Sequence, residues 1–161
     1  VLKYGDRPLL IVKTPATKPY AKIVAGVDYS DHSKRALEFV LRMAPGAEVT
    51  VLHTYHIPYA GMPKPKALAG AVAKGAKSED TEHLEAWLKQ FAQLVERTKC
   101  TLIPVVQHGH AETLIPNFVK ATGTDLVAIG THGRTGFRHA ILGSVAEGLI
   151  TSLPCDVLVV R

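Results

Sequence analysis

The chain has few aromatic residues, few cysteines and no long apolar run. Only 6% of its 161 residues are aromatic, and 2 are cysteines. No apolar stretch approaches the roughly 20 residues that span a bilayer, and the N-terminal segment lacks the features of a secretory signal. These absences favour a folded cytoplasmic protein with no membrane partner. We expect Cys100 and Cys155 to be small buried hydrophobes.

Motifs of several catalytic classes are also missing. The chain has no G-x-S-x-G elbow, no Cys/His couple, and no paired carboxylates at a predicted strand end. It also lacks the G-x4-G-K-S/T loop with its phosphate-binding lysine. We therefore nominate no catalytic residue.

The positive charges are scattered along the chain. The formal net charge is +5, but no basic stripe with interleaved aromatics appears. We expect a solvated basic surface that weakly attracts phosphate ligands, and no nucleic-acid partner. Histidines 53, 56, 108 and 110 fall near two predicted strand ends, but no carboxylate or cysteine completes a metal-ligand set there. We expect no metal site.

Apolar runs typical of strands alternate with segments of helical periodicity. Strands separated by helices predict parallel pairing in a three-layer α/β sandwich. Residues 57–77 are rich in Pro, Gly, Ala and Lys, have no clear period, and are interpreted as a loop excursion. Strands are predicted over residues 22–28, 48–55, 101–107, 125–129 and 156–160, and helices after Ser30, after Ser78, over 111–121 and after Ser144.

A glycine-rich segment, GTHGRTGFRHAILGS, runs from Gly130 to Ser144 between a predicted strand and a predicted helix. Glycine lets a ligand approach the main chain, and a helix N-terminus suits a phosphate. Ligands of such sheets bind where the strand order reverses, so Val27-Asp28 and Ile129-Gly130 are expected together at a nucleotide site if their two strands straddle that point. Two simpler interpretations stay open: Asp28 caps the following helix, and the glycines only shape the loop.

Residues 1–13 (VLKYGDRPLLIVK) resemble residues 149–161 (LITSLPCDVLVVR) in the order of apolar, turn and basic positions. We interpret Leu9 to Val12 as the last strand of an earlier, largely missing copy of the same fold; an unrelated N-terminal strand is the alternative. The linker is long enough for this strand to run antiparallel to Asp156–Val160, on its own or a partner's sheet. We expect an N-terminal strand and linker over residues 1–20 and a domain over 21–161.

The spacing G-x2-G-x9-G-S, formed by Gly130, Gly133, Gly143 and Ser144, resembles the ATP-binding signature of the universal stress protein family. VDYS at 27–30, VLHTY at 51–55, DLVAIGTHGR at 125–134, LGSVAEGL at 142–149 and the closing PCDVLVVR resemble that family in order. The resemblance implies a five-stranded parallel sheet of order 3-2-1-4-5, here with an extra N-terminal edge strand. It also implies a homodimer or tandem pseudo-dimer through edge strands, with an unknown client protein.

Carried over residue by residue, the resemblance implies a site for ATP, with Mg or Mn bound through the phosphates. Asp28 would approach the ribose or adenine, and Thr54 would offer main-chain groups to the adenine. Gly130 would lie against the ribose, and Arg134 would screen phosphate charge. Main-chain groups of the glycine-rich segment would surround the phosphates. The full expected set is Gly26, Val27, Asp28, Thr54, Ile129, Gly130, His132, Gly133, Arg134, Gly143, Ser144 and Val145.

The function that these expectations favour is an ATP-binding stress-response module, acting as a ligand-dependent regulator or interaction domain. Slow hydrolysis of bound ATP is the most chemistry that we expect, because nothing nominates a general base. Two alternatives stay open: an ATP-hydrolysing or adenylating enzyme of the same superfamily, and an apo module that interacts through its edge strand.

Overall fold

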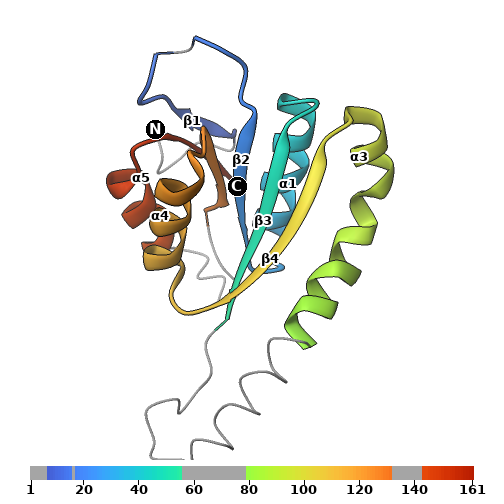
Figure 1. Ribbon diagram of the computed structural model, residues 1–161. Helices are drawn as coiled ribbons and strands as arrows, with labels where there is room; N and C mark the ends of the chain where they lie inside the picture. Colours follow the sequence, from blue (N-terminus) through green and yellow to red (C-terminus); the bar gives the residue numbers. More distant parts are fainter. Residues whose placement is uncertain (1–6, 16, 56–78, 132–142) are drawn as a thin grey trace, which may run out of the picture.

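The computed structural model describes residues 7–15, 17–55, 79–131 and 143–161 (Figure 1). Strands and helices alternate along the chain as the periodicity predicts. Residues 79–88 are helical and lead directly into η1. The other elements are β1 (Leu9–Ile11), β2 (Lys22–Val27), α1 (Asp31–Met43), β3 (Glu48–Tyr55), η1 (Lys89–Phe91), α3 (Ala92–Thr98), β4 (Thr101–His108), α4 (Ala111–Thr122), β5 (Leu126–Gly130), α5 (Ser144–Ser152) and β6 (Asp156–Val160).

The sheet has six strands in the order β1-β6-β5-β2-β3-β4. Strands β2 to β6 are parallel to their neighbours, whereas β1 runs antiparallel to β6, with Leu10 opposite Leu158. The sheet is therefore mixed and six-stranded. Within it, the parallel strands follow one another as the resemblance implies, and the N-terminal strand lies on the edge of its own sheet.

Helices cover both faces of the sheet (Figure 1). On one face, α1 buries Leu37 and Leu41 with Leu84 and Phe91 of the helical residues 79–98. On the other face, α4 and α5 bury apolar side chains against β5 and β6, among them Ile115 and Leu149. The buried apolar residues of α1 recur with the helical period, Ala36 and Leu37 in one turn and Val40 and Leu41 in the next, which gives that helix one apolar face.

Several predicted boundaries differ from the structure. β2 ends at Val27, so Asp28 lies in the following turn rather than in the strand. The long helix after residue 78 is interrupted by the 3-10 turn η1, and Ser78 itself lies outside the described residues. Pro116 lies inside α4, in its second turn. Because proline has no N–H, the helix lacks one hydrogen bond near its beginning.

The N-terminal segment is held by Asp156 at the start of β6. One carboxylate oxygen of Asp156 accepts hydrogen bonds from the main-chain N–H of Lys13 (2.8 Å) and of Thr14 (3.1 Å) and from the Thr14 hydroxyl (3.1 Å). The other accepts one from the Tyr20 hydroxyl at 2.6 Å. These bonds lower the pKa of Asp156 against the opposing effect of its burial, which is the largest single influence.

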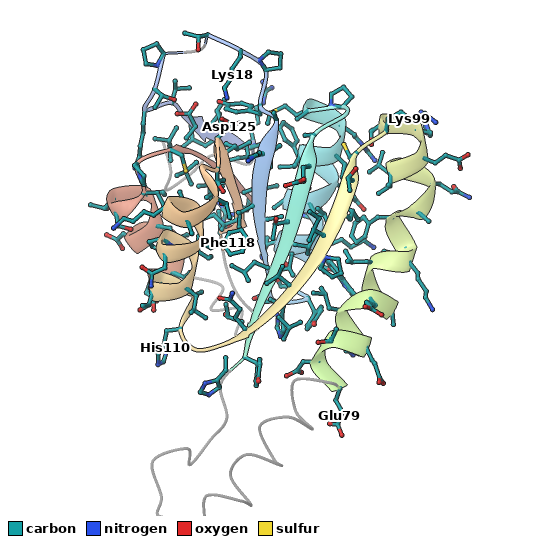
Figure 2. All side chains as sticks on the ribbon, viewed as in Figure 1. Lys18, Glu79, Lys99, His110, Phe118 and Asp125 are labelled. Carbon is teal, nitrogen blue, oxygen red and sulfur yellow. The ribbon has the colours of Figure 1, made fainter. Side chains whose placement is uncertain are left out.

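A second carboxylate, that of Asp125 before β5, holds the end of the same segment. One of its oxygens accepts hydrogen bonds from the main-chain N–H groups of Ala21 and Lys22, each 3.0 Å long. Lys18 approaches the other oxygen at 3.1 Å. Figure 2 shows Lys18 and Asp125 at one end of the sheet, and Glu79 and His110 at the opposite end.

Cys100 and Cys155 are both buried and free, as predicted. The thiol of Cys100 lies 3.3 Å from the carbonyl oxygen of Ala44, which joins the end of α1 to the start of β4. Burial raises the pKa of the Cys155 thiol, so neither cysteine has the exposed, electropositive surroundings of a reactive thiol.

Candidate functional site

The candidate site lies where β2 and β5 run side by side at the centre of the sheet. From β2 the chain enters α1 on one face and continues to β3. From β5 it reaches α5 on the opposite face and continues to β6. The strand order therefore reverses between β2 and β5, and ligands of open α/β sheets bind beside the carboxyl ends of such strands.

Asp28 lies at the carboxyl end of β2 and is tied to the start of α1. Its Oδ1 atom accepts hydrogen bonds from the Ser30 main-chain N–H (3.1 Å) and the Ser30 hydroxyl (2.6 Å). The Asp28 N–H faces the Ser33 hydroxyl at 3.4 Å. Ser30 is the N-cap that the sequence predicts, because its hydroxyl accepts from the Ser33 N–H at 3.2 Å. Asp28 therefore supports the cap and carries a fixed carboxylate at this edge.

Gly130 is required by packing in the structure. A Cβ atom built on Gly130 would lie 2.8 Å from Cβ of His32 and 2.9 Å from the main-chain nitrogen of Ser33. The first turn of α1 thus rests directly on the end of β5. Contact between Gly130 and a ribose stays a prediction. The close packing of α1 on Gly130 is by itself enough to require a glycine there.

The sequence predicts that the N-terminus of α5 binds phosphate, and this stays a prediction. Gly143 is its N-cap, and within the described residues no side chain makes a capping hydrogen bond there. The Gly143 N–H donates to the Thr131 carbonyl at 2.8 Å, and the Glu147 N–H to the Gly143 carbonyl at 3.0 Å. The N–H groups of Ser144 and Val145 lie in the first turn, where an α-helix offers no intrahelical acceptor, so they suit an anion.

Other predicted residues have different surroundings. The register pairs Val27 with His53, so Thr54 comes one position beyond the level of Val27, near Asp28. Gly26 faces the opposite layer: a Cβ there would lie 3.2 Å from Ile115 and 3.3 Å from Ile129. Gly26 and Ile129 thus pack with α4 on this side. The predicted residues His132, Gly133 and Arg134 lie outside the described residues.

An aromatic cluster beside Asp28 is a feature that sequence reasoning missed. The ring of Tyr29 has its centroid 4.4 Å from that of His53, 4.5 Å from that of His83 and 5.6 Å from that of Trp87. These residues come from a turn, a strand and a helix that are far apart in the sequence. The only local signal is the aromatic residue inside VDYS, which does not reveal its neighbours.

The histidines of the described residues do not form a metal-binding group. In residues 7–15, 17–55, 79–131 and 143–161, no group of three or more His, Cys, Asp or Glu side chains could hold a metal ion. His108 packs against the ring of Tyr55, with centroids 5.4 Å apart. His56 lies outside the described residues.

Comparison with known proteins agrees with this architecture. A profile of the universal stress protein family matches residues 19–161. The chain belongs to the universal stress protein family. Universal stress protein MJ0531 of Methanocaldococcus jannaschii is 30% identical over 145 residues, which make up 88% of this chain and 82% of that relative. The universal stress protein E homolog of Haemophilus influenzae is 41% identical over 56 residues, 35% of this chain but 18% of the relative.

Solved universal stress proteins share the fold. UspA from Lactobacillus plantarum superposes with a TM-score of 0.72 at 22% identity, covering 90% of this chain and 100% of that one. A universal stress protein solved in complex with cAMP gives 0.63 at 20% identity, covering 89% and 99%. A universal stress protein from Archaeoglobus fulgidus superposes with a TM-score of 0.65 at 18% identity. The match covers 99% of this chain but 51% of that one.

Proposed function

We propose that this universal stress protein binds an adenine nucleotide, ATP in the first place, at the carboxyl edge between β2 and β5. The observation that carries the proposal is the placement of two complementary groups after these neighbouring strands: the fixed carboxylate of Asp28 and the N-terminus of α5, which no side chain of the described residues caps. A carboxylate accepts hydrogen bonds from sugar hydroxyls, and helix N–H groups donate to phosphates.

Two further observations support a nucleotide over other anions. Thr54 lies in the last two residues of β3, one position beyond the level of Val27, where its main-chain groups could meet a base. A universal stress protein of the same fold was solved in complex with cAMP. Mg or Mn would enter with the nucleotide through its phosphates.

The proposed role is that of a ligand-dependent regulator or interaction domain in the stress response. The described part of the site holds the Asp28 carboxylate, which accepts hydrogen bonds from Ser30, and helix N–H groups, which bind an anion without transferring a proton. The nucleotide is therefore proposed as a bound signal, and any hydrolysis as slow.

No helix in the described ranges is long and apolar enough to cross a membrane, and the cytoplasmic location stays a prediction.

Isothermal titration of the purified chain with ATP, ADP, AMP and cAMP, each with and without Mg, tests the proposal. We expect saturable one-site binding of at least one adenine nucleotide, and weaker binding of GTP as the control for base recognition. Mass spectrometry of ligand released from freshly purified protein gives an independent readout. The absence of binding by all of these nucleotides at millimolar concentration would overturn the proposal.

A second candidate function, assembly through the sheet edge at β1, is favoured by the pairing of that strand. β1 extends the sheet antiparallel to β6; Leu10 in the strand is 38% exposed, and Val12 just after it is 58% exposed. The Archaeoglobus structure matches 99% of this chain, whereas the UspA structure matches 90%. The matched region makes up 51% of the Archaeoglobus chain. We propose that the outer edge of β1 pairs with a second domain of this fold, in a homodimer or a tandem pseudo-dimer.

Light scattering after size exclusion tests this assembly. We expect dimers of the chain, and monomers when Leu10→Glu and Val12→Glu place charge on the exposed edge. Phe39→Glu, a substitution on the outer face of α1 at a side chain that is also 38% exposed, is the matched control. A wild-type chain that stays monomeric at high micromolar concentration would contradict assembly between copies of this chain.

A further inference from the structure

We infer that Tyr29 is a positioning residue of the nucleotide site. Its ring is held by rings from β3 and the following helix, and this fixes the turn that presents the Asp28 carboxylate. The inference rests on the proposed function for its purpose, but the positioning itself can be measured without a ligand.

The backbone of Tyr29 is the first observation. Its φ angle is +65°, in the left-handed region that bulky L-residues rarely adopt. Only one other non-glycine residue in the described ranges has a positive φ, Lys99 at the end of α3. A tyrosine persists in this conformation only where its surroundings offset the strain, and such residues gather at functional sites.

The ring contacts supply the offsetting interactions. The Tyr29 and His53 rings are tilted by 39° at 4.4 Å, whereas His83 meets the Tyr29 ring edge-on at 4.5 Å and 77°. Trp87 adds a second edge-on contact at 5.6 Å and itself packs on Phe91 in the core. Rings at these separations attract one another through their quadrupoles as well as by burial. The cluster therefore joins the turn to β3 and to the helical residues 79–91.

The turn is held on both sides of Asp28. Nδ1–H of His53 donates a hydrogen bond of 2.9 Å to the carbonyl of Val27, immediately before Asp28. The ring of that same histidine packs on Tyr29, immediately after Asp28. The positive φ at Tyr29 then brings the Ser30 N–H and hydroxyl back to the Asp28 carboxylate. The ring contacts of Tyr29 consequently hold the main chain on which the Asp28–Ser30 hydrogen bonds depend.

Two substitutions separate the ring from the backbone conformation. Tyr29→Phe keeps the ring and its contacts. Tyr29→Gly removes the ring but adopts φ +65° without strain, so the variant is expected to fold. Phe39→Ala, which removes an aromatic ring from the exposed face of α1, is the matched control. A purely structural role would change overall stability with ring loss and would leave the turn unchanged in Tyr29→Gly.

Amide hydrogen exchange of Ser30 is the ligand-free readout, with Val127 in the buried centre of β5 as the internal reference. We expect Ser30 to exchange about tenfold faster in Tyr29→Gly, relative to Val127, than in the wild type. ATP should bind the same variant about tenfold more weakly, since the carboxylate is no longer pre-organised. Tyr29→Phe and Phe39→Ala should match the wild type in both measurements.

The outcomes separate this inference from the proposed function. Unchanged Ser30 exchange in Tyr29→Gly would overturn the inference, whatever the nucleotide measurements show. Faster Ser30 exchange with unchanged ATP affinity would overturn the positioning role while leaving nucleotide binding intact. A wild-type chain that does not bind ATP would overturn the proposed function, and the exchange data would still decide whether Tyr29 holds Asp28.

Discussion

The Tyr20 hydroxyl donates a hydrogen bond of 2.6 Å to the carboxylate of Asp156, a side chain that is 2% exposed at the start of β6. With the bonds from Lys13 and Thr14, this contact fixes the segment that carries β1 against the rest of the sheet. A buried carboxylate is tolerated here because every one of these partners is a donor.

Replacing Asp156 by Asn is expected to lower the free energy of unfolding by about 2–4 kcal/mol, because the amide lacks the charge that strengthens these bonds and sets its NH2 group against the Tyr20 hydroxyl, which must then stop donating. Asp125→Asn is the matched control, since this side chain is 17% exposed and its Lys18 partner is 68% exposed. The control should cost about 1–2 kcal/mol. Urea unfolding measures both, and equal losses would contradict a special role for Asp156.

The same contacts predict how stability changes with pH. Despite desolvation, which acts in the opposite direction, hydrogen bonds lower the pKa of both Asp125 and Asp156 below the ordinary value of 3.8. A lowered native pKa gives stability that is present above pH 3.8 and is lost as the pH falls through the native pKa. Burial, followed by the bond to Asp156, raises the pKa of Tyr20 from 10.0 to about 12. That contribution is present below pH 10 and is lost as the pH rises toward 12.

Urea unfolding across pH 2–12 tests both the acid and the alkaline loss of stability. Tyr20→Phe should remove the Tyr20 contribution to the alkaline loss and weaken the acid one, because the phenol is absent but Asp156 keeps its main-chain donors. Tyr55→Phe, at the far end of the sheet, is the control. An alkaline loss of stability identical in Tyr20→Phe and wild type would show that Tyr20 does not titrate as the structure indicates.

Gly130→Ala should destabilise the protein by about 1–3 kcal/mol, because the new methyl group would press on the backbone of His32 and Ser33. Gly148→Ala is the matched control. Gly148 lies inside α5, and among the described residues its methyl group would meet the side chain of Glu112 alone, at 3.9 Å. This control should gain about 0.5–1 kcal/mol from helix propensity. Thermal unfolding distinguishes the two, and a neutral Gly130→Ala would show that α1 can shift away from β5.

The alternation of strands and helices was predictable, because apolar runs and helical periodicity are local signals, whereas the order of the parallel strands was an expectation from the family resemblance. The turn at Asp28 was not predictable. Whether that residue continues the strand depends on Ser30 and on rings contributed by distant elements. Likewise, Gly130 shows in the sequence only as a glycine that could serve a ligand, and its contact with α1 depends on how the layers pack.

Gly143 offers the sharpest test of the phosphate-binding role of α5. Its φ of −68° and ψ of 150° suit any N-cap residue, and a Cβ there would lie 3.1 Å from the Thr131 carbonyl oxygen. Gly143→Asp and Gly143→Asn meet the same steric demand and are both good N-caps, so they should be equally stable to within about 0.5 kcal/mol.

The two variants differ in charge. The aspartate would repel phosphates at the helix N-terminus and weaken ATP binding by about tenfold or more relative to the asparagine, and this difference should shrink in high salt. Titration calorimetry of both variants at low and high ionic strength measures the effect. Equal ATP affinities of the two variants would place the phosphates away from α5 and remove the main support for the proposed nucleotide site.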